Sequence, residues 1–202
     1  MFDPPVIAYA PILYGGAVSW VLEPNRDIDL AEVLSKRVFD DESVLIGKIL
    51  VALGSVTEQL NVPMLNGSPL FLVLLQAESM AERRYPAAAA LAAARETLRE
   101  SLEDLKLTRP ASQDGPAIIA EITQAIRLSL LAVKLLESRL LTRDPNLADV
   151  QVAQQLSSEL DTVLESQREA WLLSSRPGGL SNSIARLDPL KHALTARACF
   201  LE

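Results

Sequence analysis

Few side chains in this sequence are of types that could do chemistry, and the first candidate is the only histidine, His192. Asp188 lies four residues earlier, so both side chains would share one helix face and the carboxylate could orient the imidazole. Catalysis would also need a nucleophile, donors for a developing negative charge and a second base, and none is identifiable near this pair. We therefore expect His192 to face solvent on a terminal helix, and we predict no catalytic residue.

Acidic pairs are the next candidates, because two carboxylates could act as the acid and base of a glycosidase. Asp40 and Asp41 are adjacent, and Glu23 lies close to Asp27. Both pairs precede predicted helices, where backbone N–H groups and the helix dipole favour negative charge. We interpret these carboxylates as helix caps.

The sequence contains no recognisable motif for a metal site or a cofactor site. One cysteine, Cys199, and one histidine exclude an internal disulfide and a Cys/His zinc site. A di-iron bundle would need Glu-x-x-His twice, and no glycine-rich phosphate loop occurs. We predict no metal and no cofactor. We expect Cys199 to be a small buried side chain, and the cysteine content favours a reducing, cytoplasmic location.

Residues 4–22 carry no charge, which raises the question of a membrane span or a signal peptide. A signal peptide would begin with basic residues, and a span this short would contain several prolines and a Gly-Gly pair. We therefore predict no membrane span and a helix of a folded domain instead. Pro11 should kink this helix, and Gly15 and Gly16 should let another backbone approach closely.

A helix that is apolar around its whole circumference must be buried on all sides. The remaining helices of one chain would cover only part of the first, so an exposed remainder is expected to contact a homodimer partner or another domain. The candidate interface residues are Tyr9, Tyr14 and Trp20. The net charge of −7 and the isoelectric point near 4.9 argue against nucleic acid as a partner, so the expected partner is a protein.

The element with the clearest boundaries is a long amphipathic helix near residues 145–175. Asp144 is a good N-cap and Pro145 fits the first helical position. Apolar residues then recur at helical spacing as far as Trp171, which we expect to face inward. The helix should end before a structural stop made of Pro177, Gly178 and Gly179.

The other segments also show helical spacing, and no strand pattern persists. The sequence predicts an all-α fold, a helical bundle of about six to eight helices with the long helix at its centre. We expect a single domain over residues 1–202, with an apolar kinked first helix and its loop in 1–27 and the bundle in 28–202. Gly47 and Gly54 lie seven apart on one helix, a spacing that favours tight helix packing on that side.

Several segments of the sequence resemble segments of a known family in their residue identities and not only in their hydrophobic periodicity. The segment 14–20 followed by 23–30 resembles the stretch just after the last barrel strand of bacterial glycoside hydrolases of family 20, the β-N-acetylhexosaminidase-like type. Further pieces resemble the helical C-terminal extension of that family: 37–41, 66–68 with Leu70 and Phe71, 169–172, and 176–180 with Ser183 and Arg186.

The resemblance implies a helical domain associated with a glycosidase, without hydrolysis of its own. Members of the family resemble a TIM barrel that carries an adjacent Asp-Glu pair, and no residue here matches that pair. A chain of 202 residues is also too short for a barrel of about 250 residues in addition to these helices.

Two functional hypotheses follow. The first is a non-catalytic accessory or C-terminal domain of a glycosidase-like protein, which would pack against a barrel domain through residues 5–22. The alternative is an independent helical-bundle interaction or scaffold protein that forms a homodimer through the same segment.

Overall fold

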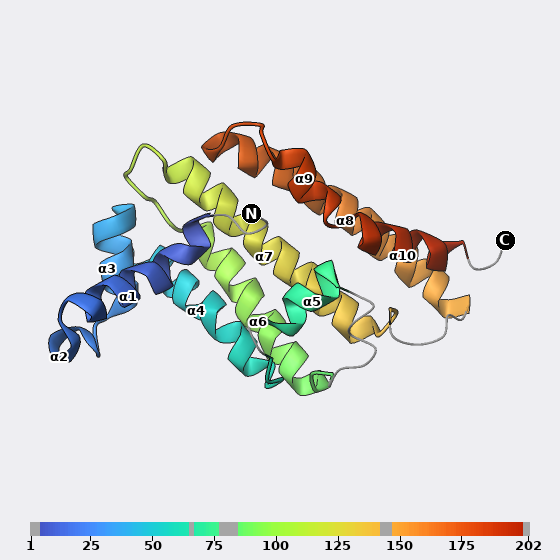
Figure 1. The fold of residues 1–202 in the computed structure, drawn as a ribbon, viewed down its shortest axis with the longest axis horizontal. Coiled ribbons are helices and arrows are strands. Elements are labelled where there is room, and N and C mark those ends of the chain that lie inside the picture. The colour runs from blue at the N-terminus through green and yellow to red at the C-terminus, as the bar shows by residue number, and fades with distance from the viewer. Residues whose placement is uncertain (1–4, 65–66, 77–84, 142–146, 200–202) are drawn as a thin grey trace.

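The computed structural model describes residues 5–64, 67–76, 85–141 and 147–199, and the described part is all-α with no strand. It contains ten α-helices, and three of them, α2, α3 and α9, are shorter than seven residues. The predicted fold class is therefore confirmed (Figure 1). One cluster of buried apolar side chains runs from Val6 to Leu194.

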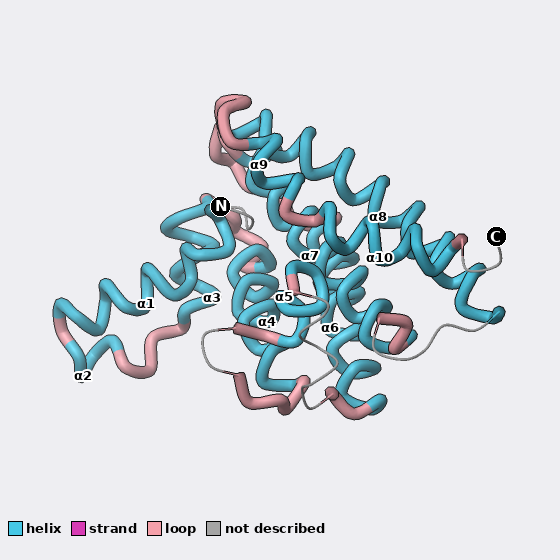
Figure 2. Tube along the Cα trace, turned by 45° about the vertical axis from the view of Figure 1, so that its right-hand side comes forward, coloured by secondary structure: helices cyan, strands magenta, loops and turns pink. Residues whose placement is uncertain are grey.

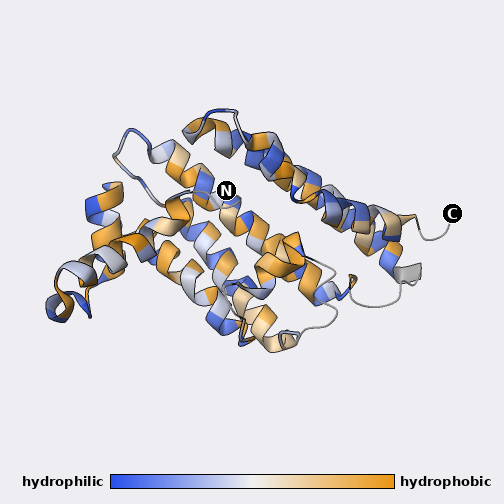
Figure 3. Ribbon diagram, viewed as in Figure 1, coloured by the Kyte–Doolittle hydropathy of each residue, from blue (hydrophilic) through white to orange (hydrophobic). Residues whose placement is uncertain are grey.

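The bundle is built from helices that pack on one another in succession. α4 (Leu45–Gln59) packs on α6 (Ala88–Leu105), which packs on α7 (Gly115–Ser138), and α7 packs on α8 (Leu147–Ser174). α5 (Pro69–Leu75) lies against α7, while α10 (Asp188–Ala198) covers α8, with α9 (Leu180–Ala185) before it. In Figure 3 the hydrophilic colours dominate α8 to α10, and α5 is mostly hydrophobic.

The long predicted helix is present as α8, but the helix at the centre of the bundle is α7. α7 contacts α5, α6 and α8, whereas α8 lies in an outer layer with α10 (Figure 1). Among the described residues, α7 is long and apolar enough to cross a membrane, if only length and composition are considered. A core helix of a bundle meets the same criterion. The predicted cap residues of α8, Asp144 and Pro145, lie outside the described residues.

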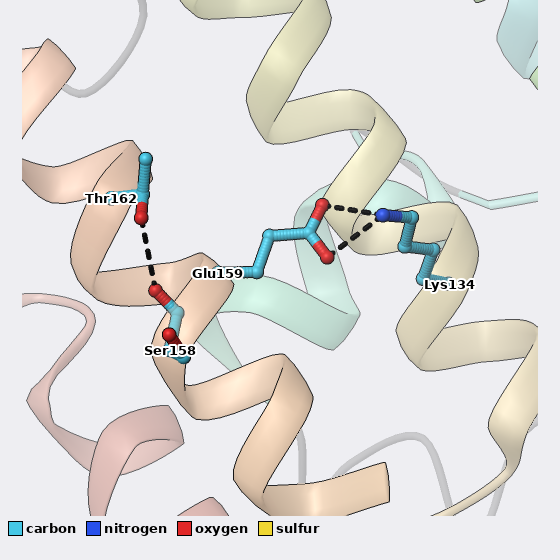
Figure 4. A network of polar contacts seen from close by, with 4 residues as sticks. All are labelled: Lys134, Ser158, Glu159 and Thr162. Atoms are coloured by element: carbon cyan, nitrogen blue, oxygen red, sulfur yellow. Dashed lines mark hydrogen bonds and ion pairs between the residues drawn. The ribbon is translucent and has the colours of Figure 1, made fainter.

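Polar contacts join α7 and α8 along their length. Lys134 Nζ of α7 lies 2.6 and 2.8 Å from the two carboxylate oxygens of Glu159 of α8 (Figure 4). Within α8, the Thr162 hydroxyl donates a hydrogen bond to the Ser158 carbonyl. Deeper in the interface, the amide of Gln124 donates to the Val163 carbonyl at 3.0 Å. Hydrogen bonds of this kind fix the relative position of the two helices along their axes.

The end of α8 differs from the prediction in one respect. Ala170 is buried at this turn, and Trp171 is only partly buried, so the expectation of a fully inward tryptophan is wrong. Its indole Nε1–H donates to the Arg176 carbonyl at 2.8 Å, and its ring lies against Gly179. Trp171 therefore stabilises the turn that follows the helix. Gly179 has a φ of 86°, a conformation that glycine adopts without strain, and it is the N-cap of α9, beyond the end of α8 at Ser174.

The first predicted helix is divided into three pieces. η1 (Pro5–Ala8) is a 3₁₀-helix, α1 spans Tyr9–Trp20, and an extended Val21 separates α1 from the short α2 (Leu22–Asn25). Pro11 falls in the first turn of α1, where its missing N–H breaks no helical hydrogen bond. The predicted kink at Pro11 is therefore wrong, and the interruptions lie on either side of α1.

α3 (Leu30–Val33) continues into the π-helical turn η2 (Leu34–Phe39), and both dock on α4. Asp29 caps α3 through the Glu32 N–H at 2.9 Å. Gly47 makes the docking close, because a Cβ at this position would lie 1.9 Å from the Ala31 carbonyl oxygen. Tight packing is thus confirmed at Gly47. It is wrong for Gly54, where a Cβ would meet nothing within 4 Å.

Candidate functional site

The residues considered first for chemistry lie apart from one another. His192 is exposed on α10, and Cys199 is exposed as well, so the expectation of a buried thiol is wrong. Within the described ranges, no group of three or more His, Cys, Asp or Glu side chains is placed to hold a metal ion.

Of the acidic residues predicted as caps, Asp41 makes a capping hydrogen bond, whereas Asp40 ends η2 in a left-handed conformation and Glu23 lies within the first turn of α2. Asp41 is buried, and its carboxylate accepts hydrogen bonds from the Ser43 hydroxyl at 2.6 Å and the Ile46 N–H at 3.1 Å. Burial alone would raise the pKa of Asp41, but these hydrogen bonds outweigh it and lower the pKa below the ordinary value of 3.8. Asp41 therefore caps the start of α4, as predicted. Glu23 forms an exposed ion pair with Arg26 at 3.7 Å.

The most conspicuous surface feature is a projecting arm formed by α1 and α2. In two views it extends away from the bundle, with α2 at its tip (Figures 1 and 2). Only Val6 of η1 and Ala10 of α1 are buried, so the rest of the fold covers little of this segment. The exposed remainder that we expected is present. Its large exposed side chains are Tyr9, Ile12, Tyr14, Trp20, Val21 and Leu22.

The arm has a defined internal structure. The side-chain amide of Asn25 donates to the carbonyls of Ala17 and Val21, at 2.9 and 2.8 Å, and so fastens α2 to the end of α1. The Tyr14 hydroxyl donates to the Arg26 carbonyl at 3.2 Å. These contacts hold the turn at the tip in one conformation while its apolar side chains stay uncovered.

The three candidate interface residues differ in their surroundings. Tyr9 stacks on Phe39 of η2, with ring centroids 5.9 Å apart, and this contact anchors the base of the arm. Tyr14 uses its hydroxyl within the arm and exposes its ring. Trp20 is 88% exposed, which is rare for a side chain of its size. The structure therefore gives Trp20 the surface most available to a partner.

A cavity of about 510 Å³ lies beneath the base of the arm, among η1, α1 and the helices α3 to α7. Its wall is mostly apolar, and no motif in the sequence indicates it. One residue could have indicated the cavity from the sequence. Gly54 is a glycine within the amphipathic helix α4, and the space beside it is open and forms part of the cavity.

Comparisons of this chain with protein-family models, with curated proteins and with solved structures found no match. The resemblance to the glycoside hydrolases of family 20 therefore stays a prediction with no support from these comparisons.

Proposed function

We propose that this chain is an interaction protein that associates with a second copy of itself through the α1–α2 arm. The exposure of Trp20 at the end of an ordered, uncharged helix carries the proposal. Aromatic side chains are enriched among the residues that contribute most to protein interfaces, and large exposed apolar patches are uncommon on monomers.

Two further observations support an arm-to-arm contact. Gly15 and Gly16 leave open space beside α1, since a Cβ at either would meet nothing within 4 Å. Glycines on a helix surface let a second backbone approach closely, and the described part of this chain does not use that room. In addition, residues 4–22 are uncharged, so two copies with a net charge of −7 each meet there without direct repulsion.

The size of the arm suits such a contact. A standard interface engages about 20–30 residues on each side, and the exposed residues of the segment from Pro5 to Asn25 would supply part of that number. A two-fold axis would place the same surface of both copies in contact and would close the assembly as a dimer.

Light scattering and sedimentation equilibrium on the full chain test this proposal. We expect a dimer at micromolar concentration. Trp20→Ala should weaken it by about thirtyfold, the loss typical of an interface hot spot, and Gly16→Leu should weaken it by blocking close approach. Leu172→Glu is the control, because Leu172 is 55% exposed on α8 and lies outside the arm.

A wild-type monomer throughout the micromolar range would refute the homodimer. A dimer that Leu172→Glu disrupts and Trp20→Ala leaves intact would place the contact on another face. If the chain is a monomer, the glycosidase prediction has its own test, which is whether the reading frame upstream of Met1 encodes a barrel with an Asp-Glu pair.

A further inference from the structure

The cavity beneath the arm has the properties of a binding site for a small apolar molecule. Its volume of about 510 Å³ lies inside the range of roughly 300–1,000 Å³ that is usual for ligand sites. It is more than three times the size of an engineered apolar cavity of about 150 Å³ that binds benzene. Side chains from six helices and η1 form its wall, so a bound molecule would contact most of the N-terminal half of the fold.

The lining determines the chemistry of the ligand. Among the described residues, no charged side chain lines the cavity, and the polar side chains of its lining are the hydroxyls of Thr57, Ser68 and Ser129. The Ser68 hydroxyl already accepts the Phe71 N–H as the cap of α5. A carboxylate or an ammonium group placed inside would have no opposite charge to pair with and would lose its hydration. The lining therefore selects against charged ligands.

The exposed members of the lining show where the cavity opens. They are Pro11 on α1 and Val51 and Gly54 on α4, so the mouth lies between these two helices. Gly54 contributes no side chain there, and a Cβ built on it meets no atom within 4 Å. A larger residue at this position would occupy the mouth without colliding with the fold.

We propose that this cavity binds an uncharged lipid-like molecule, a single acyl or isoprenoid chain whose polar group is a hydroxyl or a carbonyl. The chain would lie against the apolar wall formed by residues such as Leu50, Phe71 and Leu74, and the polar group would take a hydrogen bond from a hydroxyl of the lining. Filling the cavity restores the dispersion contacts that an open apolar wall lacks.

Titration of the full chain with Nile red, an uncharged dye that fluoresces in apolar surroundings, tests the proposal. We expect saturable binding of one dye per chain, and displacement by hexadecanol that is at least tenfold more effective than displacement by palmitate, its charged counterpart. Thr57→Val should weaken hexadecanol and leave Nile red unchanged if Thr57 is the hydroxyl that binds the polar group. If Thr57→Val changes neither, Ser129→Ala should weaken hexadecanol instead.

Gly54→Leu should lower the affinity for Nile red at least tenfold. Gly178→Leu is the matched control, because it adds the same side chain into open space in the loop between α8 and α9, away from the cavity. Circular dichroism confirms that each variant is folded, and a thermal shift on adding hexadecanol should appear in the wild type and in Gly178→Leu but not in Gly54→Leu.

Several outcomes would overturn the proposal. These are the absence of saturable binding, an equal loss in both leucine variants, or stronger displacement by palmitate than by hexadecanol. A decrease in dye binding as protein concentration rises, reversed by Trp20→Ala, would show that the arm of a second copy occupies the cavity instead. The proposal does not depend on the homodimer, because a monomer would retain the complete lining.

Discussion

Replacing Gly47 by alanine should destabilise this protein, although alanine is the better helix former. α3 crosses α4 at Gly47, and a Cβ there would lie 1.9 Å from the carbonyl oxygen of Ala31 and 2.7 Å from its carbonyl carbon. The Gly47 N–H also donates to the buried Ser35 hydroxyl at 2.8 Å. The new methyl group would therefore meet a backbone carbonyl and a hydrogen-bonded side chain.

The size of the effect follows from this geometry. An ordinary contact needs about 3.5 Å, so α3 would have to move by roughly 1.5 Å from its present 1.9 Å approach. Overpacking of a core typically costs about 1–3 kcal/mol, and the upper end applies here because a backbone carbonyl cannot rotate away as a side chain would. The higher helix propensity of alanine offsets about 1 kcal/mol of this loss in stability. We expect a net loss of about 2 kcal/mol.

Gly54→Ala is the matched control, because it makes the same change seven residues later on the same helix. A Cβ at Gly54 meets nothing within 4 Å, so only the propensity gain remains and we expect a stabilisation of about 0.5–1 kcal/mol. Urea denaturation followed by far-ultraviolet circular dichroism measures both. With a slope of about 2 kcal/mol per molar urea, Gly47→Ala should lower the midpoint by about 1 M.

Equal midpoints for the two alanine variants would refute this reasoning. Such a result would mean that α3 does not rest on Gly47 in solution, or that it shifts at no cost. The packing of α3 and η2 on α4 would then have to be revised.

Three further predictions concern the caps and the α7–α8 interface. Because the folded-state pKa of Asp41 lies below its ordinary value of 3.8, Asp41 stabilises the fold above that pH and this contribution disappears as the pH falls through the folded pKa. Asp41→Asn should therefore be less stable than the wild type at neutral pH, with urea midpoints that converge in acid, and a constant difference would contradict this. Trp171→Ala should cost about 2 kcal/mol, below the value for a fully buried tryptophan, and Trp171→Phe about 1 kcal/mol, because phenylalanine keeps a ring but loses the hydrogen bond to the Arg176 carbonyl. A urea titration that ranks Trp171→Phe below Trp171→Ala would disprove the assigned role. The exposed fractions of Lys134 and Glu159 are 40% and 28%, so a double-mutant cycle should give a coupling energy below about 1 kcal/mol that shrinks with added salt.

Helix positions were predictable where local signals determine them. α8 ends at Ser174, shortly before Pro177, while Ser68 caps α5 and Asp29 caps α3, and each of these signals lies within a few residues of the helix end. The π-helical turn η2 was not predictable, because the apolar spacing around it is also compatible with an α-helix. A left-handed Asp40 then ends η2 and directs the chain toward α4.

Features that depend on contacts between distant segments could not be read from periodicity. Gly47 and Gly54 have the same residue type on the same helix, yet one touches α3 and the other opens into a cavity. Residues 4–22 are apolar all round, which shows that the segment needs partners but not whether the chain supplies them. The cavity is formed where six helices and η1 come together, so no single segment of the sequence predicts it.

The order in which the helices pack has a consequence for how the chain assembles. α6, α7, α8 and α10 each pack on a helix that precedes them closely in sequence, a pattern of local contacts that favours fast folding as the chain emerges from the ribosome. η1 is different, because it packs on α7, which is synthesised much later. η1 therefore has to wait for α7 to be synthesised before it can dock on that helix. During that interval, the uncharged residues 4–22 of a nascent chain would be open to a chaperone or to the same segment of a neighbouring nascent chain.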